Sequence, residues 1–123
     1  MGKKILFVED DTFLADILQQ SLTQAAFQVS IARDGEEAVT VVKKLQPDLI
    51  LLDLLLPKLD GFGVLEKLRS DPSTATIPVI ILSNLMDQDS MTKGKRLGIS
   101  AYMIKASTVP DEIIAKIKEV LHM

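Results

Sequence analysis

Five short apolar segments alternate along this chain with five longer segments whose apolar residues recur at helical spacing. A short apolar run bounded by polar or turn residues is typical of a strand that is covered on both faces, as in a parallel sheet. The predicted strands cover residues 4–8, 27–31, 49 to about 53, 78–83 and 101–105. Repeated strand–helix units with short connections predict one parallel sheet with helices on both faces.

Each predicted helix starts at a residue that favours a helix N-terminus. Aspartate and threonine side chains accept hydrogen bonds from the first free N–H groups of a helix, and proline fits its first position. The expected starting residues are Asp11 or Thr12, Asp34, Asp60, Asp87 and Pro110. The fourth helix, expected over residues 87–97, contains Gly94, and its apolar side consists mainly of Met91 and Leu97. Because glycine weakens a helix interior, we expect this helix to be loosely held.

The composition disfavours several classes of protein. The 123 residues suit one domain, expected over residues 1–123. No segment approaches the roughly 18 uninterrupted apolar residues of a membrane span, and the apolar stretch after Lys3 and Lys4 is too short for a signal peptide. The chain has no cysteine, and its net charge of −3 disfavours sequence-independent binding of nucleic acid. We therefore expect a cytoplasmic protein that contacts neither a membrane nor nucleic acid directly.

Asp53 is the single carboxylate within an apolar run at residues 49–57. Pro57 and the turn residues that follow it limit the strand, so Asp53 is expected at or near the C-terminal end of that strand. Ligands of open α/β sheets bind just beyond such strand ends. Asp60 is better placed to cap the next helix, which makes Asp53 the first functional candidate.

Polar side chains also follow other predicted strands at the same edge of the sheet. They are Glu9, Asp10 and Asp11 after the first strand, Ser83 and Asn84 at the end of the fourth, and Lys105 at the end of the fifth. Clustered carboxylates repel one another unless a cation joins them, and ligands that are all oxygen suit a hard ion such as Mg²⁺. Together with a hydroxyl and an ammonium group, such a site could hold a phosphoryl group on Asp53.

The chain resembles the receiver domains of two-component response regulators over essentially its whole length. The matching residues are Glu9, Asp10, Asp53, Pro57, Asp60, Gly61, Ser83, Tyr102 and Lys105. The resemblance implies a flavodoxin-like, doubly wound sheet of five parallel strands in the order 2-1-3-4-5, with five helices. It also implies a signalling switch, with no enzymatic activity beyond its own phosphotransfer and slow self-dephosphorylation.

The resemblance assigns the metal site and the phosphoacceptor. Asp53 would accept the phosphoryl group of a phosphohistidine donor. Asp10, Asp53 and the backbone carbonyl of Leu55 would bind Mg²⁺ directly, and Glu9 would bind it through water. Asp11 would cap a helix.

The resemblance also assigns the response to phosphorylation. Lys105 would pair with Asp53 or with its phosphoryl group. Ser83 would move to a phosphoryl oxygen, and Tyr102 would turn inward to fill the space that opens. The partners implied are a sensor histidine kinase or a histidine phosphotransfer protein, and a downstream protein that contacts the fourth helix, fifth strand and fifth helix. A monomer or weak dimer is expected, either stand-alone or cut from a longer chain.

Two departures from the family pattern bear on function. Ala106 follows Lys105, where the family usually has a proline joined by a cis peptide bond, so the geometry of this lysine is open. The residues two positions beyond Asp53 and Ser83 are Leu55 and Leu85. In the family these positions flank the path of the hydrolytic water, and here both are apolar.

Three alternatives come from other classes. A flavodoxin-like electron carrier would need a phosphate-binding loop where this chain has Glu9, Asp10 and Asp11. A haloacid-dehalogenase-like phosphatase normally has a second aspartate where this chain has Leu55. The remaining alternative is a pseudo-receiver, a protein-binding module that does not use phosphorylation. Such a module would be expected to have lost Asp53, Asp10 or Lys105.

Overall fold

The strands of this computed structural model, which describes residues 2–123, form one parallel sheet. Its strands are β1 (Lys4–Val8), β2 (Gln28–Ala32), β3 (Leu49–Leu52), β4 (Val79–Ser83) and β5 (Ala101–Ile104). Their spatial order is β2-β1-β3-β4-β5, which confirms the predicted order. This is the flavodoxin-like, doubly wound arrangement. From β1 the chain first adds β2 at one edge of the sheet, and it then adds β3, β4 and β5 in turn on the other side of β1.

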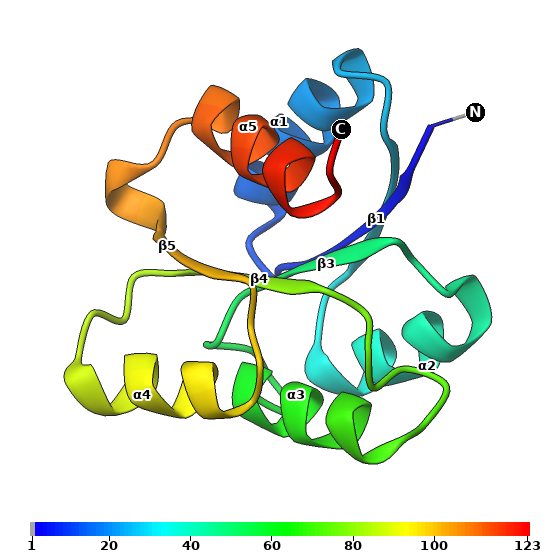
Figure 1. Cartoon of the computed structure of the whole chain (residues 1–123). Helices are drawn as coiled ribbons and strands as arrows, with labels where there is room; N and C mark the ends of the chain where they lie inside the picture. Colours follow the sequence, from blue (N-terminus) through cyan, green and yellow to red (C-terminus); the bar gives the residue numbers. More distant parts are fainter. Residues whose placement is uncertain (1) are drawn as a thin grey trace.

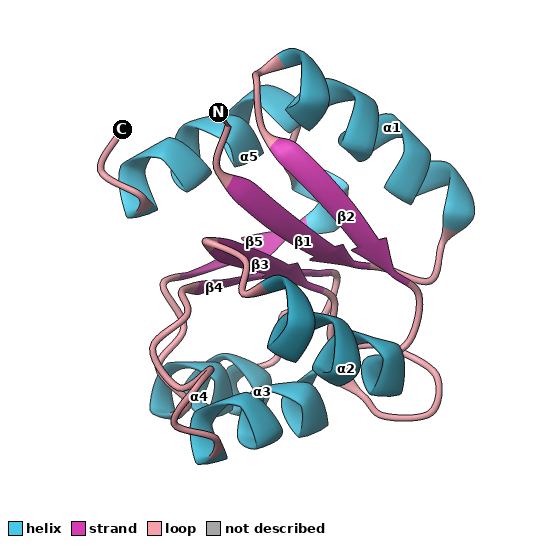
Figure 2. Ribbon diagram, turned by 90° about the vertical axis from the view of Figure 1, so that its right-hand side faces the viewer, coloured by secondary structure: helices cyan, strands magenta, loops and turns pink. Residues whose placement is uncertain are grey.

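The helices lie in two layers on opposite faces of the sheet (Figures 1 and 2). They are α1 (Thr12–Gln24), α2 (Gly35–Leu45), α3 (Gly61–Ser70), α4 (Gln88–Arg96) and α5 (Pro110–Val120). Helices α1 and α5 cover one face, and α2, α3 and α4 cover the other. None of the described helices is long and apolar enough to cross a membrane.

Alternating side chains of the strands divide the core between these two layers. Leu6, Ile50 and Ile81 belong to the cluster beneath α2 and α3, whereas Phe7 and Leu51 belong to the cluster beneath α1 and α5. Every residue of β3 is fully buried, as expected for a central strand covered on both faces. The sheet is therefore a rigid base, and its polar C-terminal edge carries the functional candidates.

The predicted helix caps are confirmed at four positions. The carboxylates of Asp11, Asp34, Asp60 and Asp87 each accept a hydrogen bond from a backbone N–H three residues further on. At the start of α5, the Glu112 carboxylate accepts a hydrogen bond from the Val109 amide instead. These bonds satisfy N–H groups that the first turn of a helix leaves free.

One expectation about local structure needs correction, and one glycine has a packing role that the sequence did not show. Lys105 does not end β5; it begins a short 3₁₀ turn, Lys105–Ser107, which the Thr108 hydroxyl supports by donating to the Ile104 carbonyl at 2.6 Å. Gly94 is more than a weak point in α4, because it is the buried residue of that helix and packs against the sheet. A Cβ at Gly94 would lie 3.2 Å from Cδ1 of Ile81, so its lack of a side chain allows the close approach.

Arg69 ties α3 to the C-terminal end of α4. Its guanidinium donates to the carbonyl oxygens of Leu97 at 2.9 Å and Gly98 at 3.2 Å, and to those of Ala75 and Ile77, both at 3.0 Å. Gly98 adopts a left-handed conformation with φ +75°, as expected for a residue just beyond a helix. The C-terminal end of α4 is therefore anchored.

Candidate functional site

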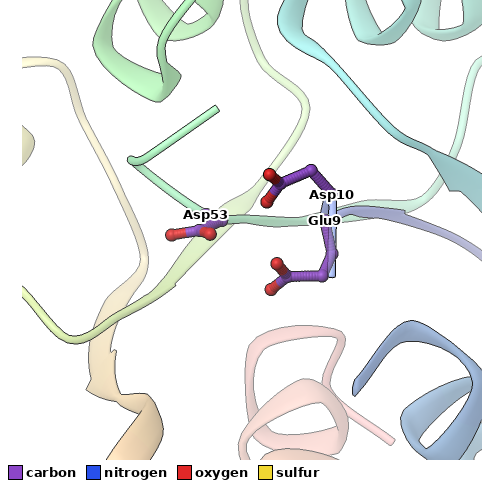
Figure 3. Close-up of side chains that lie close together, drawn as sticks. All are labelled: Glu9, Asp10 and Asp53. Atoms are coloured by element: carbon purple, nitrogen blue, oxygen red, sulfur yellow. The ribbon is translucent and has the colours of Figure 1, made fainter. Parts of the chain in front are cut away.

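Three carboxylates meet at the C-terminal edge of the sheet. Glu9 and Asp10 follow β1 and Asp53 follows β3, and the Asp53 amide still donates to the Val8 carbonyl at 3.1 Å. One oxygen from each carboxylate lies within 4.8 Å of the others, and Figure 3 shows the three side chains gathered around one space. Glu9 and Asp53 are only 1% and 3% exposed, whereas Asp10 is exposed. Buried carboxylates at this spacing need a compensating positive charge.

Lys105 supplies part of that charge. Its Nζ lies 2.8 Å from Oδ2 of Asp53 and 2.6 Å from Oε1 of Glu9. No cis peptide bond occurs in residues 2–123, so the bond from Lys105 to Ala106 is trans, and the lysine reaches Asp53 in this geometry. Burial lowers the pKa of Lys105, but the contacts with Asp53 and Glu9 outweigh burial and raise that pKa above its usual value.

Burial and charge pairing have opposite effects on the pKa of the Glu9 carboxylate. Burial has the largest effect and raises the pKa of Glu9 above its usual value. The Lys105 contact and the Asp11 amide, which donates to Oε2 at 3.1 Å, lower that pKa only in part. Its Oε1 has no hydrogen bond of good geometry within the described residues, although the Lys105 ammonium is close. An unsatisfied buried oxygen beside two other carboxylates favours a further cation.

The donor set fits Mg²⁺. Every side chain in the cluster offers a carboxylate oxygen, and one lysine does not balance three carboxylates. Asp11 does not belong to this set, because its carboxylate caps α1 through the Leu14 amide. The Leu55 amide donates to Oδ1 of Asp53 at 3.2 Å, which places the loop after β3 beside the proposed ligands.

Ser83 and Tyr102 both bind the backbone of Leu85. Ser83 is fully buried, and its Oγ accepts a hydrogen bond from the Leu85 amide at 3.2 Å. The Tyr102 hydroxyl donates to the Leu85 carbonyl at 2.6 Å. Burial, followed by the charges of Asp87 and Asp53, raises the pKa of Tyr102. Among the described residues, the structure does not bring Ser83 into hydrogen-bond contact with Asp53.

The two leucines of the sequence prediction lie beside the acidic cluster. Leu55 is 60% exposed and Leu85 is half-buried. Together with Asp10, Pro57 and Phe62 they help to line an open groove of about 380 Å³. The apolar residues of this groove therefore lie next to the proposed metal site.

Sequence reasoning found no role for Asn84. Its Oδ1 accepts a hydrogen bond from the Ala106 amide at 2.8 Å, which links the end of β4 to the turn that begins at Lys105. Its position beside Ser83 was evident in the sequence, but a contact across 22 residues was not.

Comparison with known proteins gives consistent results. The family model described as "Response regulator receiver domain" matches residues 5–118. The DNA-binding dual master transcriptional regulator RpaA of Synechocystis sp. is 38% identical over 118 residues, which are 96% of this chain and 48% of that protein. The chain thus spans about half the length of the curated relatives it matches.

Solved structures agree with the fold. A response regulator receiver domain protein (CheY-like) from Methanospirillum hungatei JF-1 has a TM-score of 0.92 at 28% identity, covering 99% of this chain and 95% of that chain. The phosphorylated cyanobacterial phytochrome response regulator RcpA has a TM-score of 0.82 at 32% identity, covering 99% of this chain and 95% of that chain.

Proposed function

Because the chain belongs to the family of response regulator receiver domains, we propose that it is a switch that phosphorylation of Asp53 activates. The observation that carries this proposal is the Asp53 carboxylate itself. It is buried at the end of β3, pairs with the Lys105 ammonium at 2.8 Å and shares its space with Glu9 and Asp10. A carboxylate in such surroundings can act as a nucleophile whose product is stabilised by nearby positive charge.

In the proposed reaction, a carboxylate oxygen of Asp53 attacks the phosphorus atom of a phosphohistidine donor. The new bond is O–P, the bond that breaks is the P–N bond to the imidazole, and the imidazole leaves. Asp10, Asp53 and the Leu55 carbonyl would hold Mg²⁺, with Glu9 acting through water, and the bound ion would offset charge on the phosphoryl oxygens. Lys105 is already oriented toward Asp53 and would contact the phosphoryl group.

The proposed response begins at Ser83. Its hydroxyl would exchange the Leu85 amide for a phosphoryl oxygen, which would remove one of the two restraints on the backbone of Leu85. Tyr102 holds the other restraint and would move inward with the loop, so phosphorylation would shift an equilibrium between two arrangements. The surface affected would be α4, β5 and α5.

The proposed phosphodonor is a sensor histidine kinase or a histidine phosphotransfer protein, and the proposed target is another protein. Direct binding to nucleic acid is not part of the proposal, because a net charge of −3 gives no general attraction to the phosphate backbone. The relative RpaA is a DNA-binding regulator about twice as long as this chain.

Incubation with acetyl phosphate and Mg²⁺, followed by intact mass measurement, tests the proposal. Wild type should gain one phosphoryl group, and Asp53→Asn should gain none. Asp60→Asn is the matched control, because asparagine also caps helices and this carboxylate serves α3. A wild type that gains no phosphoryl group would indicate a pseudo-receiver, and a gain that persists in Asp53→Asn would place the acceptor elsewhere.

A further inference from the structure

The turn from which Lys105 extends is joined to β4 by a side chain. Strands β4 and β5 pair up to Ser83 and Ile104, where the sheet ends. One residue beyond, Oδ1 of Asn84 accepts a hydrogen bond from the Ala106 amide at 2.8 Å. The side chain of Asn84 thus continues the link between the two chain segments after their backbone pairing has stopped.

The other hydrogen bonds to the backbone of this turn are local. The Thr108 hydroxyl donates to the Ile104 carbonyl at 2.6 Å, and the Thr108 amide donates to the Lys105 carbonyl at 3.4 Å. Both stabilise the shape of the turn, but neither fixes it relative to β4. Within the described residues, the Asn84 side chain makes the hydrogen bond that joins the backbone of the Lys105–Ser107 turn to a neighbouring element.

We propose that Asn84 is a positioning residue that fixes the Lys105 turn and so aims the Lys105 ammonium at Asp53. The proposal rests on the proposed function, because Lys105 matters only if Asp53 is phosphorylated. Asn84 acts through the peptide next to Lys105, since its bond is to the Ala106 N–H. Alanine makes this possible, because a proline at this position would have no N–H to donate.

A different role for Asn84 makes different predictions. Its amide group could instead donate directly to the phosphoryl group. A positioning role needs only the acceptor oxygen, which Asn84→Asp keeps. A direct role needs the N–H donor, which Asn84→Asp lacks.

The first measurement is hydrogen exchange of the Ala106 amide by NMR, without phosphodonor. Exchange should accelerate by roughly three- to tenfold in Asn84→Ala and stay near the wild-type rate in Asn84→Asp. The matched control is Gln88→Ala, which removes an exposed side chain at the start of α4 that contacts Thr92 and not the turn. Unchanged exchange in Asn84→Ala overturns the proposal.

The second measurement is the rate of phosphorylation by acetyl phosphate with Mg²⁺ in excess. Asn84→Ala should slow it by roughly three- to tenfold, because the ammonium spends less time at Asp53. Asn84→Asp should regain most of the lost rate, and Gln88→Ala should match wild type. The thermal shift caused by Mg²⁺ should be the same in Asn84→Ala and wild type, because the proposed ligands are untouched; a general structural defect would change it.

The results separate this inference from the proposed function. A wild type that takes no phosphoryl group overturns the proposed function, and the role of Asn84 with it. A wild type that is phosphorylated, with Asn84→Ala phosphorylated at the same rate, overturns the role of Asn84 alone. Restored Ala106 protection without restored rate in Asn84→Asp would favour the direct donor role and overturn positioning.

Discussion

The Tyr102 hydroxyl donates to the carbonyl oxygen of Leu85 at 2.6 Å, across the space between β5 and the loop before α4. The same leucine donates its amide to Ser83 Oγ at 3.2 Å. Ser83 and Tyr102, the two residues proposed to respond to phosphorylation, therefore bind the backbone N–H and the backbone carbonyl of Leu85, respectively. Under the proposed function, a change at either residue would reach the start of α4 through the Leu85 backbone.

Tyr102→Phe should loosen the loop before α4 without abolishing phosphorylation. It removes the hydrogen bond to Leu85 and keeps the ring. We expect amides at the start of α4 to exchange roughly fivefold faster, which is the effect of one net hydrogen bond. Hydrogen exchange with mass detection measures this, and the phosphoryl gain at Asp53 is the control. Wild-type exchange in Tyr102→Phe would show that this contact does not restrain the loop.

Mg²⁺ should stabilise the folded protein, because it would relieve repulsion among Glu9, Asp10 and Asp53. An ion that binds only the native state contributes about 2.7 kcal/mol at a hundredfold excess over its Kd. We expect millimolar Mg²⁺ to raise the Tm of wild type, and of the exposed-site control Asp16→Asn, but to raise that of Asp10→Asn much less. Equal responses in all three would rule out the proposed metal site.

The raised pKa of Glu9 predicts a pH dependence in the absence of Mg²⁺. Because burial raises the folded-state pKa of Glu9 above its usual value, this group contributes its full stabilisation of the folded state at pH values below the pKa of the unfolded chain. The contribution is lost as the pH rises through the folded-state pKa. The unfolding free energy of wild type should therefore fall relative to that of Glu9→Gln as the pH rises from 4 to 8. Urea unfolding at several pH values measures it, and a flat difference would contradict the burial effect.

Helix α4 should exchange its amides fastest among the helices of the free protein. Gly94 is the one fully buried residue of α4, whereas α1 buries Ala15, Leu18 and Leu22. Beryllofluoride with Mg²⁺, a phosphoryl mimic, should slow exchange in α4 if that helix responds to the site. Protection equal to that of α1 and unaffected by the mimic would remove α4 from the switch.

The phosphorylated state should be long-lived. Hydrolysis needs a water molecule in line with the P–O bond, and Leu55 and Leu85 offer it no side-chain hydrogen bond. Leu55→Asn and Leu85→Glu should each accelerate decay of the purified phosphoprotein by about tenfold, which corresponds to about 1.4 kcal/mol of barrier. Decay is followed after donor removal in excess Mg²⁺. If wild type decays within seconds, or the double variant decays no faster, other residues set the lifetime.

The gathering of Glu9, Asp10, Asp53 and Lys105 followed from the sequence, because the C-terminal ends of parallel strands share one edge. The strand order followed from the resemblance to receiver domains. Helix caps followed from local chemistry. The contacts of Asn84 and Gly94 did not, since they join segments that are distant in the chain and depend on how closely one element approaches another. For the same reason, the sequence did not show that Ser83 and Tyr102 meet at Leu85.

Two of the four carbonyl contacts of Arg69 hold the C-terminal end of α4, whereas its N-terminal end depends on the loop that precedes it. Leu97 and Gly98, just beyond its last turn, are tied to α3, while its first turn follows the loop held by Ser83 and Tyr102. If the loop before α4 moved, a helix held in this way would tilt about its C-terminal end rather than slide along its axis. The displacement would be largest at Asp87 and smallest at Leu97, so a partner that reads the signal would gain most by touching the N-terminal half of α4.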